Sequence, residues 1–143
     1  MLKGIDPLLG PDLLHALAAM GHGDEIGIVD ANFPVAATAR RLIRVDGAGA
    51  PAVLAAVLSL LPLDTFTGTP ASVMAVVGDP GAVPPPVCEF QAIVDGVSGT
   101  HVRLATLERN EFYERARRAF AVVVTGERRF YGNILVTKGV VPP

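Results

Sequence analysis

The sequence of 143 residues predicts a single-domain α/β fold, spanning residues 1–143, with a mostly parallel sheet. Two observations lead to this prediction. Short runs rich in valine and isoleucine alternate with helical patterns along the chain, which is typical of α/β layers. Several predicted strands, such as Ser72–Val77 and Ala121–Thr125, are continuously apolar, which indicates that helices cover both faces of the sheet. Half of the residues are hydrophobic, which is enough for one core at this length.

In the first half of the chain, three strands alternate with two helices. The helix Pro11–Met20 begins with a proline where a missing N–H does no harm, and Gly21 follows as a C-terminal cap. The helix Pro51–Leu61 is nearly all apolar, so we expect it to be buried on most sides. The strands are predicted at Glu25–Val29, Leu42–Val45 and Ser72–Val77.

The second half begins with Gly78–Pro86, which we predict to be a loop because its prolines lack backbone donors. A helix follows over Pro86–Gly96. A second helix is predicted over Glu111–Phe120, with Asn110 as its N-cap. Strands are predicted at His101–Thr106, Ala121–Thr125 and Asn133–Lys138, and Gly126–Gly132 joins the last two.

Composition excludes several classes of protein. The net charge is −2, the chain has no Trp and only eight Phe and Tyr residues, so we expect no nucleic-acid partner. The lone cysteine, Cys88, excludes an internal disulfide framework, and we interpret it as a small core residue. No apolar run approaches the ~18 residues of a membrane span. Met1–Pro11 does not resemble a signal peptide, so we expect a cytoplasmic protein without a membrane partner.

The sequence also lacks the motifs of cofactor-dependent enzymes. The glycines at 21, 23 and 27 precede a strand, unlike the dinucleotide fingerprint, so no nucleotide site is predicted. No phosphate-binding loop or nucleophile elbow is present. His15, His22 and His101 are too far apart for metal-ligand spacing, so we expect neither metal nor cofactor. The functions that remain are acid–base catalysis on a small polyhydroxylated ligand, or binding of such a ligand without catalysis.

Three polar groups follow predicted strands, where ligands of α/β sheets gather. Asp30 follows the first strand, Glu108–Asn110 follows the strand that starts at His101, and Gly126–Asn133 follows Ala121–Thr125. If these strands run parallel, one edge of the sheet brings all three groups together.

Each candidate residue has a structural and a functional interpretation. His22 lies between two glycines, so it is either a solvent-facing residue of a capping loop or a general acid or base. Asp30 is either a turn residue or an acceptor for ligand hydroxyls, and Arg109 points into water or binds a ligand oxygen. Tyr131-Gly132-Asn133 forms a hairpin turn or binds hydroxyls through its phenol and amide.

Two long segments carry a family resemblance. MLKGIDPLLGPDLLHALAAMGHGDEIGIVDANFP and NEFYERARRAFAVVVTGERRFYGNILVTKGV resemble the L-fucose mutarotase and D-ribose pyranase family, and the resemblance runs from Met1 to about Val140. Leu63-Asp64-Thr65-Phe66, Phe112-Tyr113-Glu114-Arg115 and Tyr131-Gly132-Asn133 resemble the fucose branch. The pyranase branch typically has Ala where Gly132 stands.

The resemblance implies a Rossmann-like three-layer fold without a nucleotide site. It also implies a homo-oligomeric ring, commonly a decamer, with sites formed across subunit contacts. The expected activity is that of an isomerase that interconverts sugar anomers. His22 is the implied acid or base, and Tyr131 is either a second proton carrier or a hydrogen-bond partner. Asp30, Arg109, Tyr131, Gly132 and Asn133 are the implied sugar-binding residues. A ribose pyranase and a non-catalytic monosaccharide-binding protein remain alternatives.

Overall fold

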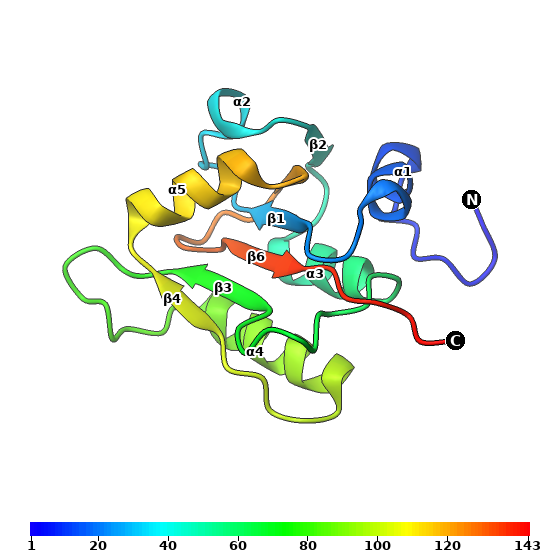
Figure 1. Ribbon diagram of the computed structural model, residues 1–143. Coiled ribbons are helices and arrows are strands. Elements are labelled where there is room, and N and C mark those ends of the chain that lie inside the picture. Colours follow the sequence, from blue (N-terminus) through cyan, green and yellow to red (C-terminus); the bar gives the residue numbers. More distant parts are fainter.

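The computed structural model of residues 1–143 consists of one six-stranded sheet and five helices (Figure 1). None of the helices is long and apolar enough to cross a bilayer. In chain order the elements are α1 (Pro11–Ala19), β1 (Glu25–Val29), α2 (Val35–Thr38), β2 (Leu42–Val45), α3 (Ala50–Leu58), β3 (Ala71–Met74), α4 (Pro85–Ser98), β4 (Ala105–Leu107), α5 (Arg109–Arg118), β5 (Ala121–Thr125) and β6 (Ile134–Thr137).

The sheet has the strand order β2-β5-β1-β6-β3-β4 and is mixed. The pairs β2–β5, β5–β1 and β3–β4 are parallel, whereas β6 is antiparallel to both β1 and β3. The prediction of a mostly parallel sheet is therefore not confirmed. Only the eight residues from Gly126 to Asn133 join β5 to β6, and a parallel crossover needs a dozen or more.

Helices cover both faces of the sheet, as the apolar strands predict (Figure 1). On one face α1, α3 and α4 bury a cluster of 24 residues, which includes the fully buried Phe90. On the other face α2 and α5 bury a cluster of 11 residues around Phe112. Consecutive residues of β1 pack on opposite faces of the sheet, since Ile28 belongs to the first cluster and Val29 to the second.

Several predicted details are wrong. The short helix α2 has no counterpart in the prediction. The N-cap of α5 is Glu108, not Asn110, because the Glu108 carboxylate accepts hydrogen bonds from the backbone N–H groups of Asn110 and Glu111. Cys88 is exposed and does not belong to the core. His15 is exposed, as its position on α1 predicts.

Candidate functional site

The carboxyl ends of β1, β4 and β5 lie at one edge of the sheet, together with the amino end of the antiparallel β6. This edge brings together four predicted residues, Asp30, Arg109, Tyr131 and Asn133, around a pocket of about 330 Å³. The remaining lining residues are Asn32, Phe33, Met74, Tyr113 and Phe130. We call this cavity the Asp30 pocket.

Asp30 and Asn133 form the floor of the pocket, and both are buried. The Asp30 backbone N–H donates to Asn133 Oδ1 at 2.9 Å. The Asn133 NH₂ group carries two hydrogens, of which one serves the Asp30 carboxyl and the other is left for a ligand. The Asp30 carboxylate accepts a hydrogen bond from the Asn32 backbone N–H at 2.9 Å. Burial raises the pKa of Asp30 above its usual value, against the effect of these hydrogen bonds, and the charge of Glu127 adds to the rise.

Tyr131 is the only non-glycine residue with a positive φ, at 61°. Such a conformation costs roughly 1–2 kcal/mol in a residue with a Cβ. The Tyr131 hydroxyl oxygen accepts a hydrogen bond from the Val77 backbone N–H at 3.1 Å, so the hydroxyl hydrogen remains free to donate. The pocket therefore contains a positioned phenol with a proton to share.

Close packing leaves no room for a side chain at Gly132. A Cβ at this position would lie 2.6 Å from Glu127 Cγ and 3.6 Å from Asp30 Cβ. The segment Gly126–Gly132 is not a hairpin turn, because β5 and β6 do not pair and β1 lies between them. Instead, the segment passes over the carboxyl end of β1, which is why it meets Asp30.

Arg109 opens α5 and is exposed at the rim of the pocket. Its Cζ lies 5.7 Å from the centre of the Tyr113 ring, and Tyr113 packs edge-on against Phe33. The guanidinium therefore rests on an aromatic wall and keeps its N–H donors for an oxygen-rich ligand. Sequence reasoning did not assign Tyr113, Phe33 or Met74 to the site, since apolar residues at such spacing are typical of a core.

His22 lies far from the Asp30 pocket of its own chain. It precedes β1, whereas Asp30 follows β1, and a strand of five residues spans roughly 16 Å. The imidazole is 47% exposed, and its ring centre lies 5.3 Å from that of Phe66. One chain therefore does not bring His22 together with the other predicted site residues.

Asp64 is the partner of His22, and sequence reasoning assigned it no role. His22 Nε2 lies 3.1 Å from Asp64 Oδ1. Burial opposes ionisation of Asp64, but hydrogen bonds from the Phe66 backbone, His22 and the Thr67 backbone together lower its pKa. An ionised carboxylate only accepts hydrogen bonds, so Nε2 carries a hydrogen and Nδ1 is free to exchange a proton with a ligand. The two residues are 42 positions apart, and only the family-like Leu63–Phe66 segment signals the pair.

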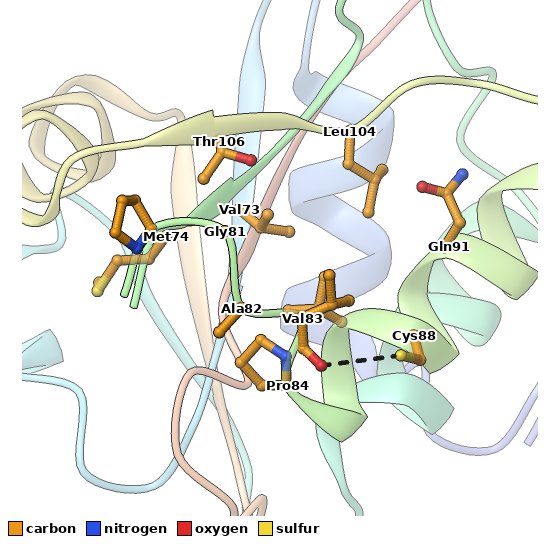
Figure 2. A pocket seen from close by; sticks show the side chains of 12 residues that line it. Val73, Met74, Gly81, Ala82, Val83, Pro84, Cys88, Gln91, Leu104 and Thr106 are labelled. Atoms are coloured by element: carbon orange, nitrogen blue, oxygen red, sulfur yellow. Dashed lines mark hydrogen bonds between the residues drawn. The ribbon is translucent and has the colours of Figure 1, made fainter. Parts of the chain in front are cut away.

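A larger cavity of about 500 Å³ lies between β3, β4 and α4 (Figure 2). Its walls are mostly apolar, with Val73, Val83 and Leu104 among them. Cys88 borders this cavity, and its Sγ lies 4.0 Å from the Val83 carbonyl oxygen. Because the cavity holds no pair of acid and base groups, it offers less chemistry than the smaller Asp30 pocket.

Comparison with known proteins identifies the family of the chain. The model of the RbsD / FucU transport protein family matches residues 3–141, which is nearly the whole chain. The chain belongs to the RbsD / FucU family. Within this family it is 50% identical to the fucose mutarotase of Homo sapiens over 145 residues, covering 97% of this chain and 94% of that protein.

Two solved structures of the family superpose along the whole chain. The fucose mutarotase of Streptococcus pneumoniae in complex with L-fucose is 42% identical, with a TM-score of 0.91 over 99% of this chain and 100% of that one. Bacillus subtilis RbsD complexed with D-ribose is 23% identical, with a TM-score of 0.73 over 99% and 100%. At 23% identity, the similarity to RbsD shows a shared fold only.

Proposed function

We propose that the protein is an isomerase that interconverts the α and β anomers of free L-fucose. The proposal depends on one observation, the convergence of a buried carboxylate, an amide, a phenol and a guanidinium on the Asp30 pocket. The cavity of about 330 Å³ suits a monosaccharide. The 50% identity to human fucose mutarotase over nearly the full length supports this choice of sugar.

Mutarotation requires proton transfers only. A base removes the proton of the anomeric hydroxyl, an acid protonates the ring oxygen, and the bond between C1 and the ring oxygen breaks. The resulting aldehyde rotates about the C1–C2 bond. The ring oxygen then attacks the other face of the carbonyl carbon, and the two protons return. Two groups that can donate and accept protons, held against the sugar, are therefore sufficient.

The residues of the Asp30 pocket bind the sugar in this proposal. Asp30 accepts hydrogen bonds from hydroxyls, while Arg109 and the Asn133 NH₂ group donate. Gly132 leaves the backbone close to the ligand. Tyr131 is one proton carrier, because its hydroxyl oxygen is held by Val77 and its hydrogen is free.

His22 is the other proton carrier, supplied by a second copy of the chain. The length of β1 between His22 and Asp30 supports a shared site. Each half also exposes an aromatic side chain, Phe66 beside His22 at 74% and Phe130 in the pocket at 75%. Exposed apolar side chains of this size are typical of interfaces.

A contact between these two different surfaces is head-to-tail, and such contacts generate a ring where the rotation between neighbouring chains closes. We therefore propose a homo-oligomeric ring, a decamer as the family resemblance implies. The same proposal includes a Rossmann-like three-layer arrangement without a nucleotide site. It also includes a cytoplasmic location, where the free thiol of Cys88 stays reduced.

Saturation-transfer proton NMR tests the activity directly. One anomeric proton of equilibrated L-fucose is irradiated, and the loss of signal at the other anomeric proton is followed with and without protein. Transfer that depends on the protein is expected, together with its loss in His22→Ala of unchanged oligomeric size. Stronger acceleration of the exchange between ribose pyranose and furanose would identify a pyranase instead. Binding of fucose without accelerated exchange would identify a non-catalytic sugar-binding protein.

A further inference from the structure

The loop that carries Tyr131 contains a buried acidic side chain that the proposed chemistry does not use. Only three carboxylates are buried in this protein, those of Asp30, Asp64 and Glu127. Asp30 lines the pocket and Asp64 holds His22, whereas Glu127 is 5% exposed and lines neither half of the site. Removing a carboxylate from water is unfavourable, so the burial of Glu127 needs a physical reason.

Glu127 is held tightly by its own loop. Its Oε1 accepts hydrogen bonds from the Arg129 backbone N–H at 3.0 Å and from Arg129 Nε at 2.9 Å, and its Oε2 accepts from Nη2 at 3.0 Å. These bonds lower the pKa of Glu127 to about 2, so the carboxylate is ionised at neutral pH. Arg129 also pairs with Glu89 of α4 at 2.6 Å, which fixes the loop to a helix.

Glu127 is also hydrogen-bonded to the carboxyl end of β5 and to the segment that follows β1, beside the Asp30 pocket. The Glu127 carbonyl oxygen accepts the Ala31 backbone N–H at 2.8 Å, directly after Asp30. The Glu127 N–H donates to Thr125 Oγ1 at 3.2 Å, and Thr125 Oγ1 donates to the Val29 carbonyl at 2.9 Å. The loop before β6 and the turn after β1 are thus joined through Glu127.

The Glu127 side chain also fills the space beside Gly132. A Cβ on Gly132 would lie 2.6 Å from Glu127 Cγ, so the glycine and the glutamate pack directly against each other. The residue before Gly132 is Tyr131, whose left-handed backbone persists only where its surroundings determine it. The packing of Glu127 against Gly132 is one such constraint within the loop.

We propose that Glu127 is a positioning residue, whose carboxylate, paired with Arg129, holds Tyr131 and Gly132 against Asp30 without touching the sugar. This inference rests on the proposed function for its kinetic consequences. Its structural consequence, the placement of Tyr131, is independent of that function.

Glu127→Gln tests the proposal, because glutamine keeps the size of the side chain but loses the charge that binds Arg129. Asp95→Asn is the matched control. The Asp95 carboxylate likewise accepts several hydrogen bonds, from Gln91, Val102 and His101, but it lines neither half of the site. Thermal unfolding and size-exclusion chromatography establish that both variants are folded and assembled.

The kinetic readout is the separation of KM from kcat in anomer exchange. A variant with fewer folded molecules loses kcat at constant KM, whereas a displaced Tyr131 and Asp30 also raise KM. We expect Glu127→Gln to lower kcat/KM about 10- to 100-fold with a raised KM, because small displacements at a reacting group have effects of this size. Asp95→Asn is expected to keep the wild-type KM.

The spectroscopic readout uses the two tyrosines of the chain. Protein labelled with 3-fluorotyrosine gives two ¹⁹F resonances, and Tyr131→Phe identifies the one that belongs to Tyr131. We expect Glu127→Gln to move the Tyr131 resonance and Asp95→Asn to leave it in place. An unmoved resonance and an unchanged KM in folded Glu127→Gln would overturn the proposal.

Failure of the proposed function gives a different result. If the wild-type protein does not accelerate anomer exchange, the function is wrong, while movement of the Tyr131 resonance still supports the positioning role of Glu127. If Glu127→Gln does not fold, the double variant Glu127→Gln/Arg129→Gln replaces it, since it removes both charges of the Glu127–Arg129 pair together. The same two readouts and the same outcomes apply to it.

Discussion

Co-assembly of His22→Ala chains with Asp30→Asn chains is expected to restore activity that neither variant has alone. The first variant keeps an intact Asp30 pocket, and the second keeps an intact His22 with its partner Asp64. Because β1 separates the two halves by roughly 16 Å, a complete site forms only where an intact His22 meets the intact pocket of another chain.

The expected magnitude follows from this arrangement. With equal amounts of the two variants and random assembly, half of the contacts contain an intact His22 and half contain an intact pocket, so about one quarter of wild-type activity returns. If one chain supplied both halves, the mixture would stay inactive. As a second test, a His22→Ala/Asp30→Asn double variant is mixed in equal amount with wild type. The mixture keeps about one quarter of wild-type activity if sites are shared between chains, and about one half if each site lies within one chain.

The assay requires assemblies that contain both kinds of chain. The two variants are expressed together with different affinity tags and purified over both matrices in succession. Anomer exchange of L-fucose is then measured by saturation transfer for each purified assembly. Inactivity of folded assemblies that contain both single variants would refute a site shared between chains.

Three further predictions concern single residues. Gly132→Ala places a methyl group 2.6 Å from Glu127 Cγ, so we expect a loss of about 1–3 kcal/mol in chemical denaturation and weaker fucose binding, whereas wild-type stability would show that the loop has room. The raised pKa of Asp30 means that the folded chain binds its proton more tightly than the unfolded chain, so stability falls as pH rises above 3.8 through the folded pKa. Asp30→Asn should therefore abolish exchange yet be at least as stable as wild type at neutral pH, and a clear loss of stability in urea titrations would contradict this. Asp64→Asn should lower kcat roughly 10- to 100-fold with a similar KM, because an amide can donate to His22 Nε2 and reverse its tautomer. NMR of the imidazole nitrogens reports the tautomer. A wild-type kcat in this variant would exclude a role of Asp64 in orienting the His22 proton.

Local chemistry was sufficient to predict most elements of the fold. Periodicity, caps and turn residues lie close together in the sequence, so α1, β1 and β5 appear within a residue of the predicted bounds. The gathering of Asp30, Arg109 and the segment Gly126–Asn133 at one edge was also predictable, because β1, β4 and β5 run parallel to one another and end at that edge.

The remaining features depend on contacts between distant segments. The direction of β6 depends on the short connection from β5 and on its pairing with β1 and β3, which local patterns do not encode. The hydrogen bond between His22 and Asp64 joins positions that no sequence period relates. The separation of His22 from Asp30 follows from their places before and after the same strand, β1.

The place of β6 also governs when the site can exist during synthesis. β6 is the last strand to leave the ribosome, yet it lies near the centre of the sheet, between β1 and β3. Until it is inserted, β1 and β3 are not joined, and Asn133 cannot meet Asp30 through the register that pairs Ile28 with Ile134. A one-residue slip in that register would turn every β6 side chain to the other face. The nascent chain therefore completes its core and the floor of the Asp30 pocket in the same late, long-range folding step.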